Sequence, residues 1–481
     1  MPKITLLVRV DQPIHRFVRG MVRSLDAQSF QDWEIVFLVP EEAPAEWYAD
    51  TPFSHEKTSI LFYRDRLLIG SLNPALSSLG EWVGFMGQHD QLEPDALEAL
   101  MATVDGSPSL IYTDCVCFSR WGAESYRQEI PNLNPVRLWH HNYLGGLNLF
   151  PRDWILSSGG FRATATDDPE HDLLIRLTSQ DGLAQAVHVP QVVYRKYRNA
   201  LFPIRDPRKL EFVPSYDLEA IEASLRNTWP KVYVQQIHAI PRIDFLDVEA
   251  PRGELVVILQ GDEAQDLRAL ELLPEPNTET GMVFRVLHTG DSPAAARRVC
   301  DFRRIPFETL EGRAESQALN QIGFHSEGAV LALLKGLAPD ETWMRGLHRI
   351  MRGFGAKAAG ARGFLEDRIV FNVPNHKYEG RYYDYRGRFG ELTVPQNVAG
   401  LSGDCLLLDV MAFRELGGFD ESFSTYYALD LTMRMHAKGY GVIWTPEVLY
   451  GAFTNETLSP EISRLAAKHP DWVDPFGLFQ V

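Results

Sequence analysis

The sequence predicts an α/β protein made of two similar units in tandem, each a mostly parallel sheet flanked by helices. Apolar strands alternate with amphipathic helices in both halves of the chain, which is the pattern that produces parallel sheets. One series of motifs also occurs twice in the same order. The 481 residues leave room for about two to four domains, so two large units fit the length.

The expected elements of the first unit follow one another from the N-terminus. Apolar runs bounded by turn residues indicate strands, and apolar residues three or four apart indicate helices. These patterns predict strands over 3–10, 33–39, 81–86 and 108–113, and helices over 14–29, 71–79 and 93–104. Sheets of this class bind ligands beyond the carboxyl ends of their strands. We therefore expect chemistry just after Val10, Leu38, Met86 and Thr113.

Paired motifs define the repeat. Each half has a Leu-Asn pair, at Leu72 and Leu319, that opens a helix leading through glycine into a buried strand. Each half later has Gly-Gly-Phe, ending at Phe161 and Phe419, and an Asp that opens a helix eleven residues further on. We place the units at 1–200 and 251–481, joined by a helix and an extended connector over 201–250.

Composition narrows the class of protein. The formal net charge of −17 argues against a nucleic-acid binder, which would need a basic face. No apolar stretch approaches the ~20 residues of a membrane span, and no secretory signal opens the chain. Four sparse cysteines predict no disulfide framework. We expect a cytoplasmic protein, soluble or peripheral at the inner face of the membrane.

Several segments resemble the family-2 glycosyltransferases. The run from Gly80 to Asp90 is similar to the strand that leads into the metal-binding aspartates of that family. Gly159-Gly-Phe161 and the stretch from Glu170 to Leu177 follow in the family's order, as do 417–423 and 439–446 in the second unit. The connector resembles that of tandem O-antigen or rhamnosyl-type transferases. This resemblance implies a GT-A fold in each unit and a nucleotide-diphosphate sugar as the donor.

The resemblance also implies a catalytic base and a donor site. In such enzymes a carboxylate at the start of the helix after Gly-Gly-Phe removes the proton of the acceptor hydroxyl. Glu170 and Asp172 stand at this position. An acidic residue in a first helical turn also favours the helix dipole, so a structural role for Asp172 stays open. The candidates for binding the nucleotide sugar are Arg9, Asp11, Asp90 and Asp114.

A metal site is the point at which the sequence departs from the family. Family members hold Mg²⁺ or Mn²⁺ with two aspartates, and the metal offsets the charge of the leaving diphosphate. Gly87 and His89 stand at those positions here. His89 and Asp90 remain as candidate ligands, although Mg²⁺ prefers oxygen.

The second unit departs further. Lys335 follows the strand where the metal aspartates are expected, and Tyr427-Ala428 occupies the position of the base. We therefore expect the second unit to be a non-catalytic copy.

Two functions remain open. The first is an inverting glycosyltransferase that transfers a sugar to a glycan, a lipid-linked saccharide or a glycoprotein in bacterial-type surface polysaccharide biosynthesis. The second is an inactive pseudo-glycosyltransferase that binds saccharide or acts as a scaffold among polysaccharide-assembly proteins. The loops over 118–132 and 374–396 are the candidates for specificity.

Overall fold

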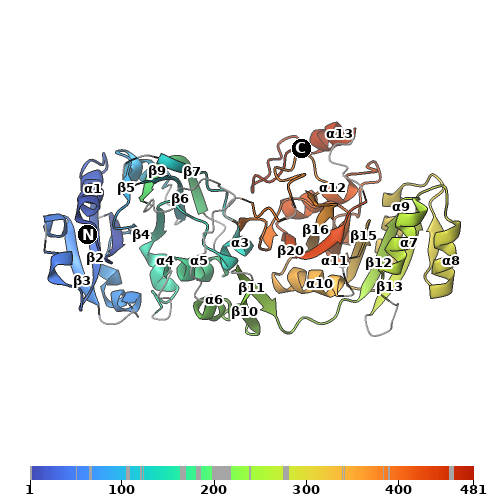
Figure 1. The fold of residues 1–481 in the computed structure, drawn as a ribbon, viewed down its shortest axis with the longest axis horizontal. Coiled ribbons are helices and arrows are strands. Elements are labelled where there is room, and N and C mark those ends of the chain that lie inside the picture. The colour runs from blue at the N-terminus through green and yellow to red at the C-terminus, as the bar shows by residue number, and fades with distance from the viewer. Residues whose placement is uncertain are drawn as a thin grey trace. The chain divides into compact units, whose positions relative to one another are not determined.

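The chain divides into two compact units, Met1–Ile243 and Asp244–Val481 (Figure 1). This boundary lies within the segment 201–250 that the sequence assigns to a connector. The computed structural model describes residues 3–49, 51–63, 68–104, 109–119, 122, 124–162, 169–179, 186–197, 218–237, 240–274, 281–338, 340, 342–382, 384–387, 390–453 and 460–481. Residues 201–217 of the connector, and parts of both candidate specificity loops, lie outside these ranges.

The first unit contains a mixed sheet with the order β3-β2-β1-β4-β8-β6-β9-β5, and β7 pairs with β6. Strands β3, β2, β1 and β4 run parallel, whereas β8 is antiparallel to both of its neighbours. The strands are β1 (Ile4–Arg9), β2 (Trp33–Pro40), β3 (Thr58–Tyr63), β4 (Trp82–Phe85), β5 (Gln91–Leu92), β6 (Leu110–Phe118), β7 (Glu124–Gln128), β8 (Asn148–Pro151) and β9 (Ala186–Tyr197). The prediction of an α/β fold is confirmed.

Helix α1 packs on this sheet through one apolar face. In α1, the residues Phe17, Val18, Met21, Val22 and Leu25 recur at helical spacing and are buried. All of them except Phe17 belong to the core that also contains residues of β1, β2 and β4. The helices of the unit are α1 (His15–Asp26), α2 (Ala96–Met101), α3 (Pro135–His140), α4 (Arg152–Ser157), α5 (Pro169–Ser179) and α6 (Leu218–Leu225), with 3₁₀ turns η1 (Ala45–Trp47), η2 (Thr51–Ser54) and η3 (Leu68–Ser78).

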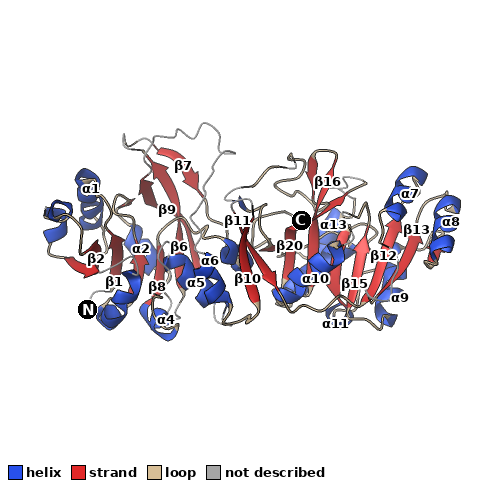
Figure 2. Cartoon of the chain, turned by 60° about the horizontal axis from the view of Figure 1, so that its bottom comes forward, coloured by secondary structure: helices blue, strands red, loops and turns tan. Residues whose placement is uncertain are grey.

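The second unit repeats this arrangement, with the order β14-β13-β12-β15-β19-β16-β20-β18 and β17 paired to β16 (Figure 2). Its strands are β12 (Gly253–Leu259), β13 (Met282–His288), β14 (Phe307–Thr309), β15 (Val330–Leu334), β16 (Ala358–Leu365), β17 (Arg368–Val370), β18 (Gln396–Asn397), β19 (Cys405–Asp409) and β20 (Val442–Gly451). Its helices are α7 (Glu263–Glu271), α8 (Ala294–Arg303), α9 (Glu315–His325), α10 (Trp343–Gly353), α11 (Val410–Glu415), α12 (Tyr427–Ala437) and α13 (Ile462–Lys468). A two-stranded ribbon, β10 (Val232–Ile237) and β11 (Ile240–Phe245), lies at the division between the units.

The Leu-Asn motif has the same contact in both units. The side chain of Asn73 accepts a hydrogen bond from the backbone N–H of Phe161 and donates one to its carbonyl, both at 2.8 Å. Asn320 makes the same two bonds to Phe419, at 2.8 and 2.9 Å. The amide therefore fixes the Gly-Gly-Phe turn against the helix that precedes the central strand.

The first unit differs from the prediction in several elements: β5 and α3 were not predicted, and β7 lies within the segment 118–132 that was predicted as a loop. Two further differences have a clear physical reason. Strand β3 was not predicted: it lies at the edge of the sheet, where Phe62 remains 45% exposed, so its apolar pattern is weak. The segment predicted as a helix over 71–79 is the 3₁₀ helix η3, which contains Pro74, whereas its counterpart α9 is a regular α-helix. Proline lacks the N–H that a helix interior needs, which accounts for the difference. Among the described residues, no helix has both the length and the apolar character to cross a membrane.

Candidate active site

The carboxyl ends of β1 and β3 bring Arg9 close to Tyr63. Burial raises the pKa of the Tyr63 phenol, while the Arg9 guanidinium, which hydrogen-bonds to it, acts to lower that pKa. Arg9 and Asp11 are both exposed at this edge of the sheet. Their charges therefore face the region where the sequence predicts a donor.

The loop after β4 is tied to the loop after β1. The side chain of Gln88 donates to the carbonyl of Asp11 at 2.5 Å and accepts from its N–H at 3.2 Å. Next to it, Nε2 of His89 accepts a hydrogen bond from the N–H of Ile14 at 2.9 Å. Burial lowers the pKa of His89, which keeps the ring neutral. The Nε2 lone pair that a metal would need is thus occupied at the start of α1.

Asp90 is buried and both of its carboxylate oxygens accept hydrogen bonds. The phenol of Tyr194 donates to Oδ2 at 2.5 Å, and the backbone N–H of Tyr197 donates to Oδ1 at 2.7 Å. The same phenol accepts a hydrogen bond from the N–H of Gly87 at 3.1 Å. Burial raises the pKa of Asp90, and the bond from Tyr194 lowers it. Asp90 therefore fastens the loop after β4 to β9.

These contacts do not fit a divalent metal site. Mg²⁺ and Mn²⁺ need several oxygen ligands directed at one point, but the candidate ligands Asp90 and His89 are directed at protein donors. Within the described ranges, no group of three or more His, Cys, Asp and Glu side chains is arranged to hold a metal ion.

Asp114 joins three segments of the first unit. Its Oδ1 accepts from the N–H of Ile130 at 2.8 Å and lies 2.9 Å from Nε2 of His188 on β9. The His188 ring in turn stacks on Tyr112, with centroids 4.8 Å apart. Asp114 is 5% exposed. Through these contacts Asp114 holds the segment at Ile130 and strand β9 together. The binding of a nucleotide sugar by Asp114 stays a prediction.

Asp172 forms a buried clamp with Arg176 one turn later in α5. Its Oδ2 accepts from Nε and Nη2 of Arg176 at 3.0 and 2.9 Å, and its Oδ1 accepts from the hydroxyl of Ser224 at 2.6 Å. The guanidinium also donates to the carbonyls of Ser158 and Gly160 at 2.7 and 2.9 Å. The ion pair thus holds the Gly-Gly turn that precedes the helix.

The second unit has the same clamp. Asp430 accepts from Nε of Arg434 at 2.9 Å, and the guanidinium donates to the carbonyls of Leu416 and Gly418 at 2.7 and 2.8 Å. Since the position of the base is Ala428 in this unit, the clamp does not depend on catalysis. The repetition favours the structural interpretation of Asp172 that the sequence left open.

Glu170 differs from Asp172 because it stays half-buried in the first turn of α5. Its Oε1 accepts a hydrogen bond from Nδ2 of Asn148 on β8 at 2.6 Å. Asn148 was not among the predicted site residues. A polar side chain at the start of a buried apolar strand was the signal that could have identified it. Asn148 orients a carboxylate at the start of α5, where the sequence predicts a base.

In the second unit a lysine stands where the resemblance to family-2 glycosyltransferases implies metal-binding aspartates. Lys335 directly follows β15, and its Nζ lies 2.6 Å from Oε2 of Glu315 and 5.1 Å from the centroid of the Tyr427 ring. Burial acts to lower the pKa of Lys335, but Glu315 and Tyr427 raise it well above its usual range. This cluster is neutralised internally, so it offers no carboxylate pair for a metal.

Comparisons with known proteins give distant relatives. No family model matches the sequence. The chain is 23% identical to an uncharacterized protein y4gI of Sinorhizobium fredii, over 92% of this chain and 52% of that protein. It is 21% identical to the O-antigen biosynthesis protein RfbC of Myxococcus xanthus, over 93% of this chain and 37% of that protein. The chain thus spans about half and about a third of the lengths of these relatives.

Solved structures of S. aureus TarS share a limited similarity. One TarS structure is 12% identical, with 47% of this protein and 40% of that chain covered at a TM-score of 0.33. A TarS 1–349 structure is 13% identical at the same TM-score, with 66% of that chain covered.

Proposed function

We propose that the chain is a glycosyltransferase of bacterial surface polysaccharide biosynthesis, with its chemistry in the first unit. The observation that carries this proposal is the match to an O-antigen biosynthesis protein, which extends over 93% of the chain. The resemblance of the sequence to family-2 glycosyltransferases supports the same class and a GT-A architecture in each unit. The donor is a nucleotide-diphosphate sugar and the acceptor is a saccharide.

In this mechanism Glu170 is the general base. It takes the proton of the acceptor hydroxyl while that oxygen forms a bond to the anomeric carbon and the bond to the diphosphate breaks, with inversion. Asn148, 2.6 Å from Oε1, orients the carboxylate. Arg9 and Asp11 stand at the donor edge, where the guanidinium offsets the charge of the diphosphate and the carboxylate accepts hydrogen bonds from the donor. We propose no metal step, because the oxygens of Asp90 are already engaged.

Calorimetric titration of the full chain with UDP-, GDP- and dTDP-sugars, each with Mg²⁺, with Mn²⁺ and with a chelator, tests the proposal. We expect one donor to bind equally under all three conditions. Absence of donor binding under every condition would refute the enzyme.

Substitution then tests the base. Glu170→Gln should reduce transfer by about 10²–10⁴-fold while donor affinity is retained. Glu98→Gln is the matched control, because Glu98 also lies in a first helical turn but is exposed on α2. Transfer at the wild-type rate by Glu170→Gln would remove this residue as the base.

A second candidate is a non-catalytic saccharide-binding protein of the same assembly pathway. The engagement of both Asp90 oxygens by Tyr194 and Tyr197 favours it, since a loop built in this way has lost the metal site of the family. Absence of donor binding in these titrations, together with calorimetric binding of a saccharide such as a methyl glycoside, would support this candidate.

A further inference from the structure

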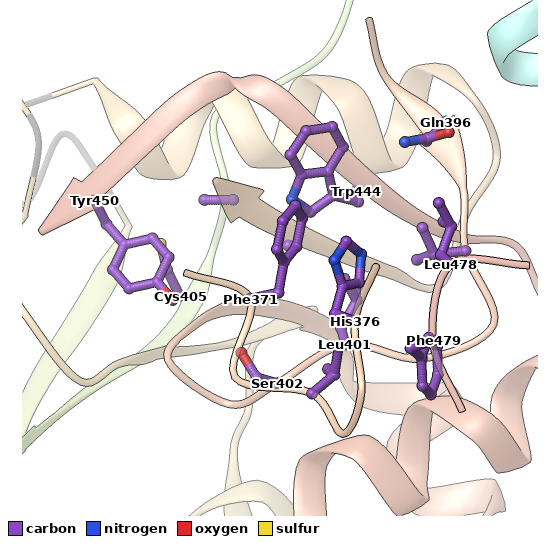
Figure 3. A pocket seen from close by; sticks show the side chains of 15 residues that line it. Phe371, His376, Gln396, Leu401, Ser402, Cys405, Trp444, Tyr450, Leu478 and Phe479 are labelled. Carbon is purple, nitrogen blue, oxygen red and sulfur yellow. The ribbon is translucent and has the colours of Figure 1, made fainter. Parts of the chain in front are cut away.

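A small cavity lies beside β16 and β20 of the second unit (Figure 3). Its lining includes the side chains of Phe371, His376, Trp444 and Tyr450. Its volume is about 30 Å³. This is enough for water but far below the roughly 300–1,000 Å³ of a small-molecule site. A sugar ring therefore does not fit this cavity.

The outer surface of the same unit carries an exposed phenylalanine. Phe302 lies in the last turn of α8 and is 89% exposed, whereas Ala295, Ala296 and Cys300 of this helix are buried. Figure 1 shows α8 at the edge of the unit, beside β13. A single exposed apolar side chain is common in folded proteins and by itself indicates nothing. The charged neighbours of Phe302 distinguish it.

Arginines without ion partners lie next to Phe302 in the chain. Arg298 precedes it by one helical turn, so the two side chains are neighbours on the surface of α8. Arg304 follows it by two positions. Among the described residues, neither guanidinium forms an ion pair or a side-chain hydrogen bond. Both positive charges are therefore directed at solvent.

This arrangement is not general in the unit. Three arginines on neighbouring segments each pair with a carboxylate at 2.6–2.9 Å: Arg268, Arg285 and Arg313. Residues 297–304 contain four arginines and one aspartate, a net charge of +3, in a chain with a net charge of −17. The end of α8 is thus a local basic surface on an acidic protein.

The backbone of Arg304 adds an independent observation. Its φ of 56° and ψ of 38° are left-handed, which is the conformation that glycine usually adopts after a helix. The turn is closed by the N–H of Ile305, which donates to the carbonyl of Cys300 at 2.8 Å. A side chain is disfavoured in this conformation. The charge of Arg304 is therefore retained at a cost to the helix end, which indicates a task outside the fold.

We propose that the C-terminal turn of α8 docks on an anionic lipid surface. Phe302 enters the headgroup region, and the guanidiniums of Arg298 and Arg304 bind lipid phosphates. A protein interface needs a wider apolar core, but α8, which the structure describes in full, exposes no large apolar side chain besides Phe302. The acidic net charge opposes nucleic acid.

Docking of this kind also bears on the acceptor. A chain held at a lipid surface meets lipid-linked saccharides, so this acceptor is favoured over a soluble glycan or a glycoprotein. The choice of acceptor rests on the proposed function, whereas the docking does not.

Sedimentation of the full chain with vesicles tests the docking. The probe is a vesicle of phosphatidylcholine and phosphatidylglycerol in equal parts, and a vesicle of phosphatidylcholine alone is the reference. Two arginines near the surface should make binding to the anionic vesicle about 10–30-fold stronger. Salt at about 1 M should remove this difference, because it screens charges beyond about 3 Å.

Three variants locate the surface. Phe302→Ser should weaken binding at least about 10-fold, because the ring no longer enters the lipid. Arg298→Gln should weaken it about 5-fold. Arg304→Gly should also weaken it about 5-fold, while its thermal unfolding temperature does not fall, because glycine suits the left-handed turn. Loss of binding by Arg304→Gly thus cannot come from misfolding.

Two controls match these changes elsewhere on the chain. Met411→Ser removes an apolar side chain that is 68% exposed on α11. Arg226→Gln removes a charge that is 55% exposed on α6 and paired with a carboxylate. Both variants should bind the anionic vesicle as the wild type does.

The outcomes separate the docking from the proposed function. Absence of vesicle binding, equal binding to both vesicles, or wild-type binding by the Phe302 and arginine variants would refute the docking. A dimer in sedimentation velocity that Phe302→Ser dissociates would also refute it, because a second copy would then cover α8. Vesicle binding without donor binding would leave the docking assigned and refute the transferase, and the reverse would refute only the docking.

Discussion

Replacing Asp172 by asparagine separates a structural from a catalytic role. The carboxylate and the guanidinium of Arg176 are 2% and 1% exposed, with an N–O distance of 2.9 Å. Asparagine preserves the shape but removes the charge, so the Arg176 cation stays buried without its counterion. Arg162, 3.7 Å from the same carboxylate, would add repulsion. Breaking one partner of a buried pair costs about 3–5 kcal/mol.

Denaturation of the full chain by urea, followed by circular dichroism, measures this cost. Because the two units can unfold separately, each transition is fitted by itself. Asp153→Asn is the control: Asp153 is 83% exposed, so the loss of its ion pair with Arg152 should cost less than about 1 kcal/mol.

Asp430→Asn provides an internal comparison. Its cationic partners Arg434 and Lys468 are 22% and 33% exposed, so water can solvate the released charges and the cost should be smaller than for Asp172→Asn. An Asp172→Asn variant with wild-type stability and abolished transfer would refute the structural argument and make Asp172 a catalytic residue.

Three further predictions concern buried polar groups. Burial raises the pKa of Glu379 to about 7, so the stability that its protonated form provides is complete below its ordinary pKa and is lost as the pH rises through 7. In urea titrations between pH 5 and 8, Glu379→Gln should therefore gain about 2 kcal/mol of unfolding free energy over the wild type, whereas the exposed Glu327→Gln should not. A pH profile of Glu379→Gln that matches the wild type would contradict this. Tyr194→Phe removes the phenol that donates to Asp90 and should cost about 1–3 kcal/mol of unfolding free energy; tight Mn²⁺ binding by this variant at unchanged stability would contradict the role given to Asp90. Asn320→Ala removes both bonds to the Gly-Gly-Phe turn and should lower only the unfolding transition of the second unit, by about 2 kcal/mol, so an equal effect on both transitions would be unexpected.

The sequence was sufficient for the α/β class, because burial on a sheet or beneath a helix leaves a regular apolar period. It was not sufficient for β3, whose edge position leaves five of its six residues exposed or only partly buried. Strand β8 was visible as an apolar run, but its antiparallel direction depends on pairing with distant strands.

The candidate site was harder to predict for a similar reason. Asp90 accepts hydrogen bonds from Tyr194 and Tyr197, about a hundred positions away, and no local sequence pattern predicts such a contact. The sequence places Asp172 at the start of a helix. Only the structure shows that it pairs with Arg176, whose guanidinium donates to the carbonyls of the turn. Glu170 stands out because its contact is with Asn148, a residue that has no counterpart of its kind in the second unit, where the equivalent strand position is Leu406.

The Asp-Arg clamp occurs in both units, although the surrounding side chains differ between them. The Asp-Arg pair and the Asn amide hold the Gly-Gly-Phe turn without using any group that the chemistry would require. A unit built in this way can carry Ala428 at the position of Glu170, or Lys335 after its central strand, and still keep its sheet. Duplication of such a scaffold leaves each copy free to change the side chains at the edge of its sheet while the turn stays fixed.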